Sequence, residues 1–225
     1  MAKYSLVAVL GGLLIGLAAC SAVPVGSDPS LTDSQRDQVQ RETRRPPAEL
    51  GKSDPTVVVE SDMPVPLDQF SSWFTAQGAA TYSVFMTGAS ATPPVRLIAQ
   101  IHNNAVRSDA LIGSWKNVGD RRRVIFADGS SALEEITADQ PQQRFQYEVW
   151  NLTNDTGRYI SCSVSTFRFS ANERGTHIRW EYAFHPTGWP DGWLISSFVH
   201  EDVRQFMEAT LTAMQAQTRA DSASR

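Results

Sequence analysis

A few charged side chains and histidines are the residues of this chain whose types could carry out chemistry. Arg123 and either Glu134 or Glu135 lie on two strand-like stretches joined by Asp128-Gly129, a dipeptide typical of tight hairpins. Side chains on neighbouring strands meet across a sheet, so we expect an ion pair there. We favour a structural pair, worth less than about 1 kcal/mol if exposed. The alternative is a polar anchor or an acid and base inside a pocket.

The histidines do not form a metal site in the sequence. They are His102, His177, His185 and His200. No two have metal-ligand spacing, and His200-Glu201 lacks the second histidine of the zinc-protease helix. The chain also has no Gly-x-Ser-x-Gly elbow, phosphate-binding glycine loop or Cys-x-x-Cys. We therefore predict no metal and no cofactor, and we assign no catalytic residue. A pair between His185 and Asp191, which flank a Pro- and Gly-rich turn, stays open.

Cys20 ends the stretch Leu17-Ala18-Ala19-Cys20, which resembles the bacterial lipobox. There, small residues fit a peptidase cleft and the thiol accepts a diacylglyceryl group. The uncharged run before it would span only about 22 Å as a helix, less than the roughly 30 Å of a bilayer core. That length suits a signal peptide over residues 1–20. An ordinary signal peptide or an uncleaved anchor is the alternative.

Lipid on Cys20, palmitate included, would tether the chain to a cell membrane. Ser21 in place of aspartate favours the outer membrane, with the domain facing the periplasm. Cys162, the second cysteine, would then have no intrachain partner, and we expect an inert buried thiol. The net charge of −4 without clustered Lys and Arg argues against nucleic acid as a partner. Protein partners cannot be predicted.

The elements that must position these residues follow a tether. Residues 21–55 hold few large apolar side chains, which predicts a flexible segment, and a short helix without an apolar face stays open over Thr32–Glu42. The folded domain is predicted over residues 56–217, with a flexible tail over 218–225. It begins with a strand at 57–59 and a short helix at 66–74, and residues 76–112 are left unassigned. Alternating apolar residues predict antiparallel strands over 123–127, 132–137, 144–153, 159–169 and 176–185. Apolar residues at helical spacing predict a closing helix over 193–217.

This order of elements resembles the START-like (SRPBCC) superfamily, which includes the polyketide cyclase/dehydrase and Bet v 1-like groups. The resemblance covers roughly residues 56–217. The local matches are Val118-Gly119-Asp120-Arg121-Arg122-Arg123, Asp128-Gly129, Glu134-Glu135-Ile136, Tyr147 and Gly175-Thr176-His177-Ile178-Arg179-Trp180. It implies an α+β helix-grip fold, in which an antiparallel sheet wraps around a long C-terminal helix. The segment 76–112 is longer than the family pattern, and its role stays open.

The resemblance further implies a cavity between sheet and helix that binds a hydrophobic or amphipathic small molecule, lipid or polyketide-like, as carrier or sensor. We expect it to be lined by Trp115, Phe126, Tyr147, Trp180, Tyr182 and Phe206, with Arg123, Glu134 and His185 as polar candidates. Two alternatives stay open. A cyclase- or dehydratase-like enzyme would need a histidine or carboxylate of perturbed pKa in the cavity. A cavity filled by its own rings would favour a cell-envelope interaction module. Catalysis is the less favoured interpretation.

Overall fold

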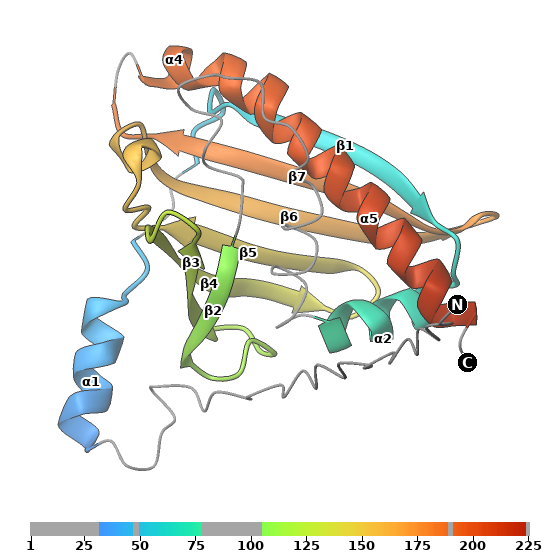
Figure 1. The fold of residues 1–225 in the computed structure, drawn as a ribbon, viewed down its shortest axis with the longest axis horizontal. Coiled ribbons are helices and arrows are strands. Elements are labelled where there is room, and N and C mark those ends of the chain that lie inside the picture. Colours follow the sequence, from blue (N-terminus) through green and yellow to red (C-terminus); the bar gives the residue numbers. More distant parts are fainter. Residues whose placement is uncertain (1–31, 47–49, 78–104, 189–190, 224–225) are drawn as a thin grey trace, which may run out of the picture.

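The computed structural model describes residues 32–46, 50–77, 105–188 and 191–223 (Figure 1). The strands are β1 (Thr56–Met63), β2 (Ala105–Ile112), β3 (Arg121–Phe126), β4 (Ser131–Gln140), β5 (Arg144–Trp150), β6 (Ile160–Asn172) and β7 (Gly175–Pro186). The helices are α1 (Asp33–Glu42), α2 (Leu67–Gln77), the 3₁₀ turn η3 (Asp155–Arg158), α4 (Asp191–Phe198), the π-helical η4 (Val199–Val203) and α5 (Arg204–Ala223).

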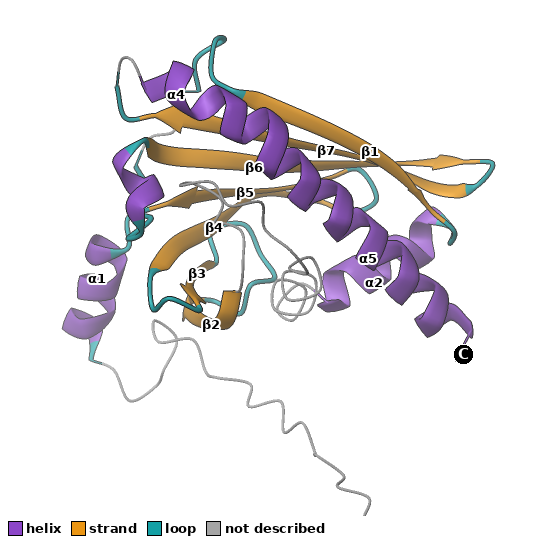
Figure 2. Ribbon diagram, turned by 45° about the horizontal axis from the view of Figure 1, so that its top comes forward, coloured by secondary structure: helices purple, strands orange, loops and turns teal. Residues whose placement is uncertain are grey.

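The seven strands form one antiparallel sheet in the order β1-β7-β6-β5-β4-β3-β2. The sheet curves, α5 runs diagonally across it, and α2 lies beside the C-terminal part of α5 (Figure 2). Trp73 of α2 fixes that position, because its Nε1 donates to Asp221 Oδ2 of α5 at 2.8 Å. This arrangement confirms the predicted helix-grip fold.

Alternation along β7 shows why the sheet grips the helix. Ile178, Trp180, Tyr182 and Phe184 are all buried, and each points to the same face. Val203, Met207, Leu211 and Met214 form the buried stripe that the closing helix presents to this face. None of the helices in the described ranges has the length and apolar character needed to cross a bilayer.

Two elements differ from the sequence expectation. The closing helix is interrupted by the π-helical turn η4, so α4 and α5 replace one continuous helix. Part of the unassigned segment forms β2, which pairs with β3 at the sheet edge. Residues 78–104 of that segment lie outside the described residues.

The outer face of the sheet is also partly covered, which the predicted tether does not anticipate. Leu111, Leu133, Trp150 and Cys162 form a small buried cluster there, and Val39 of α1 packs against it. Helix α1 has a complete capping box, in which Thr32 and Gln35 satisfy each other's backbone N–H groups. Residues 32–46 are therefore structured on the domain, so the expectation of a free tether is wrong for them.

Arg45 secures this segment through charge. Its Nη1 lies 2.5 Å from Glu148 Oε2 and its Nε lies 3.3 Å from Glu135 Oε1. Glu148 is 1% exposed, and burial raises the pKa of its carboxyl while Arg45 opposes that shift. Arg121 pairs with the other oxygen of Glu135. The scarcity of apolar side chains predicted a flexible segment, but ion pairs with buried carboxylates, rather than apolar side chains, hold much of residues 32–46 on the domain.

Arg45→Ala is predicted to destabilise the fold by about 1–3 kcal/mol, because it leaves the buried Glu148 carboxylate without its cation. The measurement is urea unfolding followed by circular dichroism. Arg44→Ala is the matched control, since Arg44 is exposed and removing its charge should change little. Adding Glu148→Gln to Arg45→Ala should recover part of the loss. Equal unfolding midpoints for the two arginine variants would contradict this role of Arg45.

Candidate functional site

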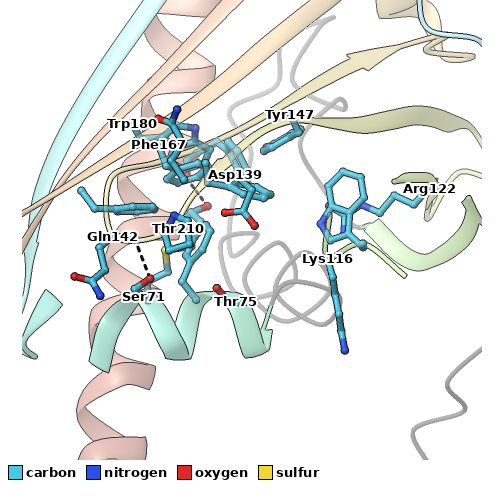
Figure 3. A pocket seen from close by; sticks show the side chains of 18 residues that line it. Ser71, Thr75, Lys116, Arg122, Asp139, Gln142, Tyr147, Phe167, Trp180 and Thr210 are labelled. Carbon is cyan, nitrogen blue, oxygen red and sulfur yellow. Dashed lines mark hydrogen bonds between the residues drawn. The ribbon is translucent and has the colours of Figure 1, made fainter. Parts of the chain in front are cut away.

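A cavity opens between the inner face of the sheet, α2 and α5 (Figure 3). The cavity has a volume of about 70 Å³, and most of its wall is apolar. It has room for several water molecules, each of which needs roughly 10–15 Å³ of such space. The rings of the core therefore do not fill the volume that sheet and helix enclose.

Aromatic rings from four elements, α2, β5, β6 and β7, make one wall of the cavity. Phe74 of α2 lies with its ring centroid 5.4 Å from those of Phe145 and Phe167 and 5.2 Å from that of Phe169. Phe167 stacks on Trp180 at 4.6 Å. These separations are those of favourable aromatic pairs. The wall is thus a continuous, rigid, apolar surface.

Trp115 enters the cavity from the loop between β2 and β3 and has a positive φ of 60°. The carboxylate of Asp120 holds this loop, because it accepts the backbone N–H groups of Ser114, Lys116 and Asn117 at 2.8–3.1 Å. Gly113 is required beside it, since a Cβ there would lie 1.9 Å from Asp120 Oδ1. A non-glycine residue at positive φ is strained, so these contacts are what keep the indole in place.

A buried ion pair lies at the same end of the cavity. Arg122 Nε donates to Glu134 Oε2 at 2.7 Å, and the guanidinium carbon lies 3.7 Å from the ring centroid of Trp115. Arg122 is 1% and Glu134 2% exposed. Such a pair must be hydrogen-bonded and stacked to offset desolvation. The predicted pairing of β3 with β4 holds, but Glu134 pairs with Arg122 and Glu135 with Arg121, so Arg123 is in neither pair.

Arg123 is a wrong candidate, because it is exposed on the other face of β3. The signal was present in the sequence: Arg122 shares the two-residue period of Val124, which is buried, whereas Arg123 does not. The strand face could therefore have been assigned from the apolar neighbour.

Asp139 is the functional candidate that the sequence pattern missed. In β4, Ile136 pairs with Tyr147 but Ala138 pairs with Gln146, so one residue is inserted between them. This bulge moves Ala138 off the inner face and places Asp139, opposite Phe145, on the cavity. Burial raises the pKa of the Asp139 carboxyl. A strict two-residue alternation from Ile136 would point Asp139 outward, so no periodic signal could have found it.

The cavity mouth is formed by α2 and the turn after β4. Ser71 Oγ accepts the backbone N–H of Gln142 at 3.2 Å, which ties α2 to this turn (Figure 3). Thr75, Lys116 and Thr210 add polar atoms to the lining. The lining is therefore apolar with polar groups at separate points, an arrangement that suits an amphipathic molecule.

Four of the six predicted ligand-binding residues line the cavity. They are Trp115, Tyr147, Trp180 and Phe206. Tyr182 is buried one step further along the inner face, where its hydroxyl oxygen lies 3.4 Å from Ser163 Oγ. Phe126 is not part of the lining and packs against the small buried cluster of Ala105 and Val124. Their roles in binding stay predictions.

His185 does not face the cavity, and its partner is Asp54 rather than Asp191. His185 Nδ1 lies 2.8 Å from Asp54 Oδ2, whereas Asp191 Oδ2 accepts from Thr187 Oγ1. Cys162 is buried, and burial raises the pKa of its thiol. Cys20 lies outside the described residues. Within the described ranges, no three His, Cys, Asp or Glu side chains are grouped as metal ligands.

Comparison with known proteins identifies the family and the fold. Residues 96–219 match the family model described as polyketide cyclase / dehydrase and lipid transport. A solved structure from Thermus thermophilus is 16% identical, with a TM-score of 0.51 over 75% of this chain and 99% of that one. A ginseng major latex-like protein from Panax ginseng is 13% identical, with a TM-score of 0.49 over 72% and 95%. No curated protein matches the chain.

Asp139→Asn is predicted to stabilise the fold slightly at neutral pH, by less than about 0.5 kcal/mol, because it removes a charge that partial burial disfavours while solvent screens much of that cost. The pKa of the Asp139 carboxyl is higher in the folded than in the unfolded state. Its contribution to stability is therefore fully present below the ordinary pKa of 3.8 and is lost as the pH rises through the raised pKa, where the folded carboxyl ionises. The gain should therefore vanish near pH 3. Urea unfolding at both pH values measures it.

Asp128→Asn is the matched control, because hydrogen bonds from Ser130 lower the pKa of the Asp128 carboxyl. Its ionised form stabilises the fold above the ordinary pKa, and this contribution is lost as pH falls through the lowered value. The same substitution should therefore destabilise at neutral pH. A loss of stability in Asp139→Asn at neutral pH would contradict the cost assigned to its burial.

Proposed function

We propose that this chain, which belongs to the polyketide cyclase / dehydrase and lipid transport family, binds a hydrophobic or amphipathic small molecule in the cavity between its sheet and α5. The observation that carries the proposal is the open, ring-lined space itself. Small-molecule sites are concave, mostly apolar and equipped with a few polar groups that fix orientation. The cavity meets each of these conditions.

The apolar wall supplies the affinity in this proposal. Burying apolar surface contributes about 25 cal/mol per Å², and rings held by their neighbours lose little freedom when a ligand arrives. Phe145, Phe167 and Trp180 are held in this way by ring contacts on more than one side. A ligand with a flat or branched apolar body fits such a wall.

The finer proposal is a lipid-anchored carrier or sensor at the outer membrane, facing the periplasm. It is supported by the lipobox-like residues 17–20 and the uncharged run before them. Lipid on Cys20 would hold the cavity beside a bilayer, where apolar molecules are concentrated.

A cyclase- or dehydratase-like enzyme is the second candidate, because one observation favours it. Asp139 is a carboxylate of raised pKa on the cavity, which is the feature that general acid–base chemistry requires. No histidine accompanies it among the lining residues described. Binding without chemistry therefore remains the better supported function. The interaction module is disfavoured by the open cavity.

Thr210→Phe is predicted to weaken binding of the neutral fluorescent probe N-phenyl-1-naphthylamine at least tenfold, because the added ring occupies the cavity. Titration of probe fluorescence measures the affinity. Overpacking of this kind costs about 1–3 kcal/mol of stability, so folding is checked by circular dichroism.

Thr212→Phe is the matched control for the cavity substitution. Thr210 and Thr212 both lie on α5 and both donate to the carbonyl four residues earlier, but Thr212 is exposed. Its variant should bind the probe as the native chain does. Absence of probe binding by the native chain, with no apolar molecule in its organic extracts, would overturn the proposed function.

Cys20→Ser is predicted to abolish palmitate labelling and move the protein from the membrane fraction to the soluble fraction. Cys162→Ser is the control, because its thiol is buried and should not be acylated. Labelled palmitate followed by fractionation measures both. Labelling that persists in Cys20→Ser would refute the lipid anchor while leaving the binding proposal untouched.

A further inference from the structure

We propose that Asp139 selects the ligand, so that the cavity takes an apolar ring compound carrying a neutral or cationic hydrogen-bond donor, a hydroxyl or an amine, rather than an anionic lipid. The inference rests on the proposed binding function. It concerns which molecules are bound, and it holds for a carrier, a sensor or an enzyme.

The backbone of β4 is built to present this carboxylate. The bulge after Ile136 reverses the alternation of the strand, so that the side chain opposite Phe145 is Asp139. Bulges re-aim side chains next to binding and active sites. A regular strand would have placed Ala138 on the cavity and left the carboxylate in solvent.

The carboxylate has acceptor capacity that the described part of the protein does not use. Within the described residues, no hydrogen bond or ion pair is made by its oxygens, and partial burial raises the pKa of its carboxyl. An ionised carboxylate accepts hydrogen bonds and donates none. Partial burial of this carboxylate is unfavourable unless a hydrogen-bond donor compensates it. A ligand that donates to Asp139 therefore binds more tightly and also stabilises the folded protein.

The other ionisable groups that line the described part of the cavity do not supply that donor. Arg122 is bonded to Glu134 and stacked on Trp115. Lys116 is exposed, and its side chain extends away from Asp139 in Figure 3. Tyr147 lies beside Trp115, with ring centroids 6.2 Å apart. Among the described residues, the negative charge of Asp139 is therefore the one that a ligand meets next to the ring wall, and it disfavours an anion there.

The rings around Asp139 define the rest of the ligand. Phe145 is directly opposite on β5, and its ring centroid lies 5.4 Å from that of Phe74 and 6.1 Å from that of Tyr147. A rigid ring body packs on these faces and brings a substituent at its edge to the carboxylate. A site of this kind rejects an analogue that lacks the donor, because its own acceptor would stay unpaired.

Three probes of similar size test the inference: 2-naphthol, 2-methoxynaphthalene and 2-naphthoate. The methyl ether keeps the ring body but removes the donor, and the naphthoate replaces it with an anion. Calorimetric titration at neutral pH is expected to show the native chain binding 2-naphthol about tenfold more tightly than the ether, the size of one hydrogen bond to a charged acceptor. The naphthoate should bind most weakly.

Asp139→Leu is expected to bind 2-naphthol and the ether equally, retain affinity for the ether and gain affinity for the naphthoate. Asp139→Asn, which keeps one acceptor oxygen, should show an intermediate preference and guards against misfolding of the leucine variant. Asp155→Leu, at an exposed position in η3, should behave as the native chain does.

Two failures are distinguishable. If the native chain binds N-phenyl-1-naphthylamine but shows no preference for 2-naphthol over the ether, or binds neither, donor selection by Asp139 is wrong and the proposed function stands. If it binds none of the four compounds, the proposed function is wrong and the inference falls with it. A preference that persists unchanged in Asp139→Leu also overturns the inference.

Discussion

Antiparallel pairing dictates which side chains face the cavity, and the rest of the site depends on that constraint. Each residue points to the same face of the sheet as the residue opposite it on the neighbouring strand. The rings of β5, β6 and β7 therefore lie together on one surface as a result of the strand register alone. One inserted residue in β4 reverses the face to which the following residues of the strand point, so that Asp139 lies opposite Phe145. The site is thus an apolar wall set by regular pairing and a carboxylate set by a single irregularity.

The sheet is unusual in burying charge on both faces, and arginine makes this possible on each. Arg122 compensates Glu134 on the inner face, where the guanidinium also stacks on Trp115. Arg45 compensates Glu148 on the outer face, together with the structured segment before β1. A planar, always charged group with several donors suits both positions. The inner pair fixes one end of the cavity, and the outer pair fixes the chain that leads into the domain.

The sequence predicted most of the fold and part of the site, and the difference has a physical origin. Period-two alternation found β3 to β7, and helical spacing found α2 and the closing helix, because those signals repeat over many residues. It placed Trp115, Tyr147, Trp180 and Phe206 near a cavity that they do line. It failed for Arg122, although the period that this residue shares with the buried Val124 indicates the inner face, and for Asp139, where a bulge breaks the period. It failed also for residues 32–46, whose contacts are mainly charged.

Asp139 is the point where stability and function separate. Stability alone would favour a regular strand with Ala138 inward, since a partly buried carboxylate without a compensating donor in the described structure weakly opposes folding. Glu134 shows what a carboxylate on this face looks like when folding is its role: it is buried and accepts a hydrogen bond from Arg122, whose guanidinium stacks on Trp115. Asp139 has none of these partners in the described residues, yet the backbone departs from regular pairing to present it. Asp139 faces the cavity although its burial opposes folding. We therefore infer that a hydrogen-bond donor of the bound ligand offsets the unfavourable burial of its carboxylate.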